Sequence, residues 1–215
     1  MKTAKKAMLM TLCAIILVVA TVFGTMAYLT STDKVVNTFT VGNVAIKLDE
    51  AKANTDGSLV TGADRVKANS YKLLPGHTYN KDPMVTVLNG SEASYIKMTV
   101  TFSKAKELDA IFAADGGADL TSIFNGYDST NWIAKGNTKD ADGNTRTYEF
   151  WYKEAVGAPT TDVALDALFD SITVPSSIDK EQLATIEGMT ITVNAYAIQA
   201  DGFDTADKAW EAFKG

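Results

Sequence analysis

Apolar and polar residues alternate over much of this chain, and this two-residue period predicts β-strands. Residues 95–102 alternate without interruption, which places four apolar side chains on one face of a strand: Ile96, Met98, Val100 and Phe102. The opposite face carries Tyr95, Lys97, Thr99 and Thr101. Similar runs predict strands at residues 38–48, 83–88, 147–156 and 189–199. Gly, Asn and Asp separate these runs, as in an all-β domain linked by turns.

Turn residues indicate how these strands connect. Asn89-Gly90 lies between two predicted strands and tolerates positive φ, so it predicts a hairpin. Asp142-Gly143 precedes the strand at 147–156 and predicts a second one. Gly42-Asn43 stands where the alternation of the first strand slips by one residue, which predicts a bulge or a tight turn. Residues 50–68 are polar and predict a surface loop.

Three segments lose the two-residue period. Residues 103–114 predict a short helix or insertion, and residues 177–186 a short helix with a Ser or Asp N-cap. Residues 204–213 predict a helix capped by Thr205, with an apolar stripe of Ala206, Ala209, Trp210 and Phe213. The stretch around Phe124 and Trp132 fits neither period. The whole pattern predicts a mainly β fold: one jelly-roll-like two-sheet β-sandwich with short helical insertions over residues 37–215, preceded by an N-terminal signal helix.

An uncharged apolar run fills residues 7–27 and directly follows Lys2, Lys5 and Lys6. A positive flank, an apolar centre and a small-x-Ala end predict a secretory signal peptide over residues 1–27, cleaved between Ala27 and Tyr28. The alternative is an uncleaved membrane anchor, because the run approaches the ~20 residues that span a bilayer. In both cases we expect the domain outside the cell, either secreted into an extracellular matrix or held at the cell surface.

Composition and charge narrow the function. Loss of residues 1–27 removes three lysines and no acid, which changes the formal net charge from −6 to −9 and argues against nucleic acid as a partner. The single cysteine, Cys13, lies in the signal, so the exported domain depends on its core rather than on disulfides. His77 is the only histidine and no H-E-x-x-H motif occurs. We therefore predict no metal site, no cofactor and no catalytic residue.

Two surface features are candidates for ligand binding. Residues 140–144 place oxygens at alternate positions like a calcium loop, but Thr145 and Trp151 stand where such a loop needs a glycine and an acid, so a hairpin turn is the favoured interpretation. Exposed tryptophans could bind glycans, although we favour packing in the core for all three: Trp132, Trp151 and Trp210.

Several motifs suggest a family. The junction TMAY at residues 25–28 and the motif NTFTVGN at residues 37–43 resemble the TasA/camelysin family of exported bacterial proteins. LPG at 74–76, NGS at 89–91 and the closing VNAYAIQA at 193–200 are similar to the same family. The resemblance implies a jelly-roll sandwich, a dedicated signal peptidase, and matrix fibres in which the N-terminal strand of one subunit completes the sheet of the next. The metallopeptidase label that camelysin gives the family finds no zinc ligands here.

We therefore predict a secreted, non-enzymatic subunit of extracellular biofilm-matrix fibres. Residues 28–36 form the candidate donor strand. The apolar side chains expected to fill pockets on the next subunit are those of this segment, together with Phe39 just after it: Tyr28, Leu29, Val35, Val36 and Phe39. An extended segment can add to a sheet edge, and head-to-tail addition gives filaments. The expected partners are further copies, a signal peptidase during export, and other matrix proteins or cell-wall components. The same segment could instead fold back as the first strand of its own domain. Alternative functions are an adhesin that uses loops near Trp132 or Asp140 and, ranked last, a secreted metalloprotease.

Overall fold

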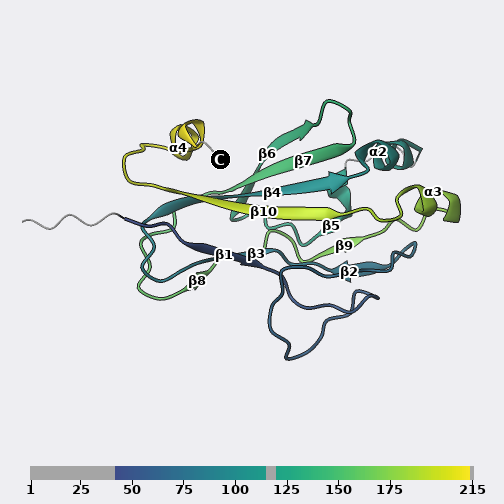
Figure 1. The fold of residues 1–215 in the computed structure, drawn as a ribbon, viewed down its shortest axis with the longest axis horizontal. Helices are drawn as coiled ribbons and strands as arrows, with labels where there is room; N and C mark the ends of the chain where they lie inside the picture. Colours follow the sequence, from purple (N-terminus) through teal and green to yellow (C-terminus); the bar gives the residue numbers. More distant parts are fainter. Residues whose placement is uncertain (1–41, 115–119, 214–215) are drawn as a thin grey trace, which may run out of the picture. The chain divides into compact units, whose positions relative to one another are not determined.

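Strands of three antiparallel sheets dominate the computed structural model, which describes residues 42–114 and 120–213 (Figure 1). The predictions for the signal peptide, the cleavage point and the candidate donor strand fall on residues 1–41 and lie outside the described residues. The chain from Gly42 onward forms one compact unit. The mainly β class predicted from the alternation is confirmed.

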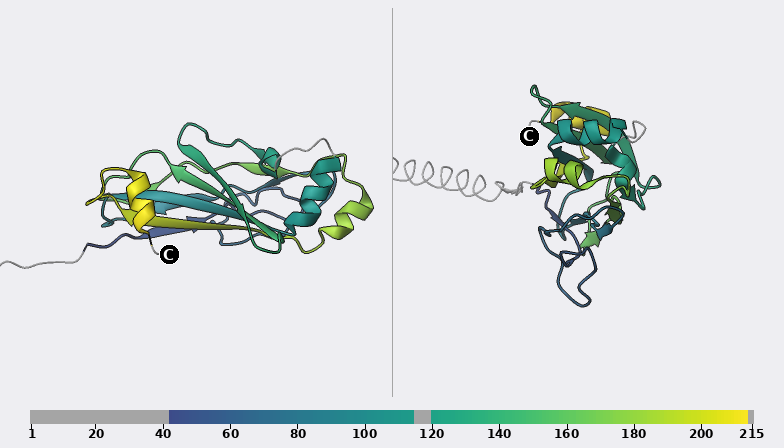
Figure 2. Two further views of the ribbon diagram at one scale, coloured as in Figure 1. Left: turned by 90° about the horizontal axis from the view of Figure 1, so that it is seen from above. Right: turned by 90° about the vertical axis from the view of Figure 1, so that its right-hand side faces the viewer.

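The largest sheet has four strands in the order β10-β4-β7-β6, with bounds Ile191–Gln199, Ser94–Ser103, Thr145–Tyr152 and Trp132–Lys139. A second sheet has the order β1-β3-β8, with bounds Ile46–Asp49, Met84–Val87 and Val163–Ala164. The third has the order β2-β9-β5, with bounds Thr78–Asn80, Ser171–Thr173 and Phe124–Asn125. The four-stranded sheet forms one layer and the two smaller sheets face it (Figures 1 and 2).

The core lies between these layers. The inward side chains of β4 are fully buried, as the alternation predicted: Ile96, Met98, Val100 and Phe102. They meet Val85 and Val87 of β3 and Tyr79 of β2 in one apolar cluster. Each such side chain contributes about 1.5–3 kcal/mol when removed from water. β4 is central because it pairs along its length with β10 on one side and with β7 on the other.

One predicted hairpin is wrong and the other is correct. Gly90 has the expected positive φ of 78° and a turn forms, but β3 and β4 belong to different sheets. The Leu88 N–H donates to the Ala45 carbonyl at 3.0 Å, so this strand pairs with β1 while the chain crosses to the other layer. Gly143, with φ 70°, does close the hairpin of β6 and β7.

Short helices occupy three predicted places. Helix α2 spans Ala105–Ala114, and the 3₁₀ turn η1 spans Leu120–Ile123. Helix α3, Lys180–Thr185, begins with a capping box in which Asp179 and Gln182 bond reciprocally. Helix α4, Ala206–Ala212, is capped by Thr205, whose hydroxyl accepts from the Lys208 N–H. Both caps match the sequence prediction.

Candidate assembly surface

Strand β10 lies at an edge of the four-stranded sheet. The Ser103 N–H donates to the Thr190 carbonyl at 3.0 Å, and the Ala200 N–H donates to the Ala93 carbonyl at 2.7 Å. The main-chain groups of the even-numbered residues of β10 therefore form hydrogen bonds with β4. Because the bonding side alternates along an antiparallel strand, the N–H and C=O groups of the odd-numbered residues of β10 point away from β4. Within the described residues no strand pairs with that side of β10. Among the described strands, this side is therefore a free edge.

The side chains at the same odd-numbered positions face the core without being fully covered. Four of them pack against the apolar cluster but stay partly exposed: Ile191, Val193, Ala195 and Ala197. Val193 stands opposite Val100 of β4, which has no exposed surface at all. A strand added beside β10 would therefore cover these apolar side chains. It would also form hydrogen bonds with the outward main-chain groups of β10.

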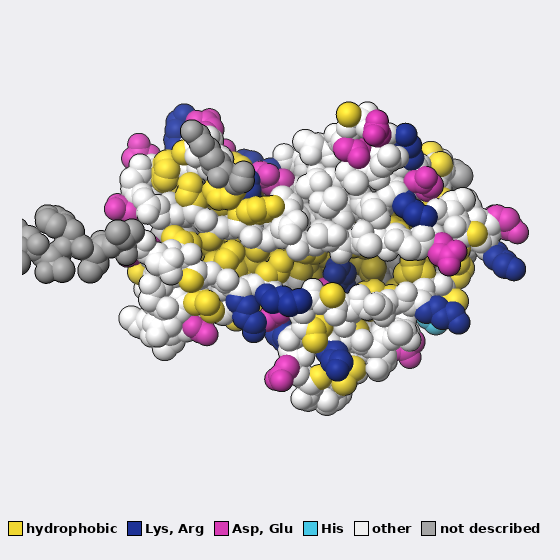
Figure 3. Space-filling model, in the orientation of Figure 1, with side chains coloured by type: hydrophobic (Ala, Val, Ile, Leu, Met, Phe, Trp, Pro, Cys, Tyr) yellow, Lys and Arg dark blue, Asp and Glu magenta, His cyan; other side chains and the backbone are white. Residues whose placement is uncertain are grey.

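Strand β1 forms the neighbouring edge in the opposite layer and contacts β10. Its inward residues Ile46 and Leu48 are likewise only partly buried. We call these six residues the apolar strip: Ile46, Leu48, Ile191, Val193, Ala195 and Ala197. Figure 3 shows apolar side chains gathered in a band between the two layers on this side, with Lys and Arg side chains at its lower border.

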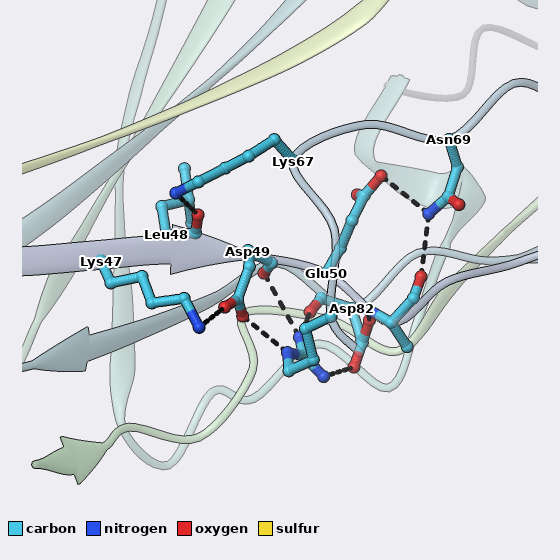
Figure 4. A network of polar contacts seen from close by, with 9 residues as sticks. Lys47, Leu48, Asp49, Glu50, Lys67, Asn69 and Asp82 are labelled. Atoms are coloured by element: carbon cyan, nitrogen blue, oxygen red, sulfur yellow. Dashed lines mark hydrogen bonds and ion pairs between the residues drawn. The ribbon is translucent and has the colours of Figure 1, made fainter. Parts of the chain in front are cut away.

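The end of β1 is covered by the loop that follows it. The Val66 N–H donates to the Glu50 carbonyl at 2.8 Å, and the Glu50 N–H donates to the Val66 carbonyl at 2.9 Å. The Lys67 ammonium donates to the Leu48 carbonyl (Figure 4). We call residues 65–67 the edge cover.

Arg65 holds the edge cover in place. Its Nε donates to Asp49 Oδ1 at 2.6 Å and its Nη1 to Asp82 Oδ2 at 2.8 Å, while Nη2 reaches the carbonyls of both aspartates. The Asp49 side chain is 2% exposed and also pairs with Lys47 at 2.6 Å. Burial disfavours the carboxylate, but hydrogen bonds from Lys47 and Arg65 outweigh it and hold the pKa of Asp49 below its ordinary value of 3.8. The same two aspartates, against the effect of burial, raise the pKa of Arg65.

A second polar group braces the same loop. Lys81 Nζ and Glu50 Oε2 form a buried ion pair at 2.6 Å. The Asn69 amide donates to Glu50 Oε1 at 3.0 Å and to the Ala51 carbonyl at 2.8 Å (Figure 4). The sequence predicted residues 50–68 as a surface loop but not this bracing, because nothing in the spacing of the charges shows which of them meet.

The candidate ligand-binding residues do not form one site. Trp132 is 1% exposed, and its Nε1–H donates to the Asp166 carbonyl at 3.1 Å, so it is a core residue. Trp210 is also buried. Trp151 corrects the prediction of core packing: it lies half-buried on the outer face of β7, with Lys135 Nζ 3.9 Å from its ring centre and Trp210 at 6.1 Å. The sequence could not show that α4 packs there.

The two remaining candidates lie in turns. His77 is exposed beside the turn at Pro75-Gly76. Asp140 accepts from the Thr145 N–H at 3.0 Å, as a residue that orders a hairpin turn does. Within residues 42–114 and 120–213, no group of three or more His, Cys, Asp and Glu side chains is placed to hold a metal ion.

A cavity of about 260 Å³ opens near the other edge of the four-stranded sheet. Four aromatic rings line it, together with Thr121, Ala134, Gly136 and Asn137: Phe124, Tyr127, Tyr148 and Phe150. Residues of β6 and β7 contribute to its lining, whereas Trp132 and Asp140, whose loops are predicted as the alternative binding region, are not part of it.

Comparison of the chain with protein-family models, with curated proteins and with solved structures found no match. Among the described helices, none has the length and apolar character needed to cross a membrane.

Proposed function

We propose that this chain is a secreted structural subunit with a jelly-roll-like β-sandwich, which assembles head to tail into extracellular matrix fibres. In this assembly the N-terminal segment of one copy adds as a strand to the sheet edge of the next. The observation that carries the proposal is the free edge of β10 with its partly exposed apolar strip. Strand addition supplies main-chain hydrogen bonds for affinity and alternate side chains for specificity.

The sequence before Gly42 suits this role. Val35, Phe39 and Val41 fall on one face of an extended segment, and Tyr28 and Leu29 extend it. Residues 28–41 are long enough to run beside all nine residues of β10. The signal predicted over residues 1–27 supports export, and proposed cleavage after Ala27 leaves Tyr28 as the new terminus.

The free energy gained by burying apolar side chains and the cost of association are similar, so assembly should depend on solution conditions. Covering four or five apolar side chains yields roughly 1.5–3 kcal/mol each at most. Association opposes this with an estimated 4–15 kcal/mol. The two terms are of similar size, so main-chain hydrogen bonds and protein concentration decide the outcome. A non-enzymatic role is part of the proposal.

Removal of residues 28–36 from the mature chain tests the proposal. We expect a folded domain by circular dichroism that no longer forms filaments by negative-stain electron microscopy. Val35→Ser with Phe39→Ser is the sharper variant, and Thr38→Ser with Thr40→Ser is its control, because the threonines fall on the other face. Filaments of unchanged repeat from the deletion variant would place the donor strand elsewhere. Persistent monomers of the intact mature chain at high concentration, at neutral and acidic pH, would contradict the fibre role itself.

A binding module is the second candidate, and the aromatic cavity favours it. Its lining of four rings with one amide suits a neutral ring-shaped ligand such as a sugar. Binding of the mature monomer to immobilised glycans, lost in Asn137→Ala, would support this candidate over the fibre.

A further inference from the structure

The two strands that border the apolar strip differ in how their edges are covered. In β1 the odd-numbered residues bond to β3, as the Leu88–Ala45 hydrogen bond shows, so Ile46, Leu48 and Glu50 direct their main chains outward. The edge cover occupies both main-chain groups of Glu50 and the carbonyl of Leu48. Ile46 is the one residue of this four-residue strand that keeps both outward groups without a hydrogen bond within the described residues.

Strand β10 has no comparable cover in the described chain. Its outward main-chain groups belong to Ile191, Val193, Ala195, Ala197 and Gln199, and no described hydrogen bond engages them. An incoming strand thus finds five consecutive pairing positions on β10 and about one on β1. Since a strand needs several ladder bonds to offset the ordering of its backbone, this difference decides between the edges.

We infer that β10 alone accepts the main chain of the incoming strand, and that residues 65–67 keep β1 closed to it. The inference rests on the proposed fibre function, and it assigns the occupant as residues 28–41 of a second copy. Lysines on sheet edges are a known means of preventing unwanted pairing. Here the Lys67 ammonium bonds to the carbonyl that a pairing strand would need.

The edge cover is fixed strongly enough to act this way. Arg65 makes four hydrogen bonds to Asp49 and Asp82, directly beside Val66 and Lys67 in sequence. Displacing residues 65–67 would leave the carboxylate of Asp49, which is almost completely buried, without its guanidinium partner. Breaking one side of a buried ion pair is strongly unfavourable. An incoming strand would gain only one or two hydrogen bonds on β1. This gain is too small to offset the cost of displacing the edge cover.

Amide hydrogen exchange of the mature chain, resolved by residue, tests the inference. We compare dilute monomer with assembled protein that is dissolved for measurement after exchange. Assembly should slow exchange by at least about tenfold at Ile191, Val193, Ala195 and Ala197, because unbonded amides become ladder donors. Ile46 and Leu48 should change little. Slowing at Ile46 and Leu48 with β10 unchanged would overturn the inference and leave the fibre function standing.

Two further outcomes separate the inference from the function. Slow exchange at β10 that is already present in the monomer, and independent of dilution, would mean that the chain's own residues 28–41 occupy the edge. Absence of any assembly would contradict the fibre function and the inference with it.

Substitution of Lys67 tests the cover. Lys67→Met keeps the aliphatic stem and removes the ammonium, so the Leu48 carbonyl becomes available. We expect assembled Lys67→Met protein to gain protection at Ile46 and Leu48, or to form laterally associated filaments that the wild type lacks. Lys52→Met, at an exposed lysine of the same loop, is the control and should behave as the wild type. Identical exchange patterns for Lys67→Met and wild type in the assembled state would show that Lys67 does not close β1.

Discussion

At the scale of single residues, Lys97 shows that the face of a strand can be predicted from the alternation, whereas the exposure of a side chain on that face cannot. The alternation placed it on the outer face of β4, and the structure confirms this. However, its side chain is only 14% exposed, since it lies 4.6 Å from the ring centre of Trp210 and 5.2 Å from that of Phe213. Glu149 lies 3.5 Å away on the neighbouring strand. The lysine therefore links the sheet to α4 rather than facing water alone.

We expect Lys97→Glu to destabilise the domain by about 1–2 kcal/mol. The change removes cation–π contacts worth roughly 0.5–2 kcal/mol and places a second acid beside Glu149. Chemical denaturation followed by tryptophan fluorescence measures the difference. Lys72→Glu, at an exposed lysine, should stay within about 0.5 kcal/mol of the wild type. Equal stability of the two variants would contradict the role given to Lys97.

Val100 and Val193 stand opposite each other but should respond differently to the same substitution. Val100→Asp buries an unpaired charge, which costs several kcal/mol against a typical total stability of about 5–15 kcal/mol. We expect no folded protein. Val193→Asp lies on the partly exposed edge, so the domain should fold with a lower melting temperature and fail to assemble. Unfolding of both variants to the same extent would mean that Val193 is as enclosed as Val100.

At the scale of secondary-structure elements, the sequence predicted those whose pattern depends on one buried face. Strands β4, β7 and β10 and the caps of α3 and α4 follow from local alternation and from single capping residues. Strand β6 was missed because its residues from Ile133 to Lys139 are exposed, so burial imposes no alternation on them. The partner of β3 was missed because Asn89-Gly90 fixes a turn without fixing the sheet to which the next strand belongs. The edge of β10 could not be foreseen, since it is defined by the absence of a pairing strand among residues 42–114 and 120–213.

The loop between β1 and β2 should lose stability in acid. The pKa of Asp49 in the folded protein lies below the ordinary 3.8, so its ionised form stabilises the fold above that value. The contribution is lost as the pH falls below about 3.8 towards the folded pKa. The basic groups that face this carboxylate are Lys47 and Arg65.

Urea unfolding between neutral pH and pH 3 measures this contribution. Asp49→Asn should be less stable than the wild type at neutral pH, and the gap should narrow below pH ~4 as Asp49 protonates. A gap that stays constant across this range would exclude the Asp49 carboxylate as its source.

At the scale of the whole molecule, charge opposes the proposed assembly. The chain without residues 1–27 carries a formal net charge of −9, so like-charged copies repel one another. The screening length falls from ~30 Å at 0.01 M salt to ~8 Å at 0.15 M. We expect filament growth, followed by light scattering, to accelerate several-fold over this range. Sucrose at equal osmolality is the control. Growth that slows with salt would show that attraction between charges drives the contact.

Under the proposed fibre function, the partly exposed inward face of β10 also bears on the lifetime of the protein. Any ligand that binds only the folded chain raises its stability, and here the ligand would be a neighbouring subunit. A solitary copy, with its apolar strip uncovered, would open more often than an assembled one and would offer proteases more cleavable chain. Subunits within a fibre would persist while stray ones are digested and recycled. The unpaired edge of β10 would then make unassembled copies the preferred substrates of proteases, and no separate quality-control factor would be needed.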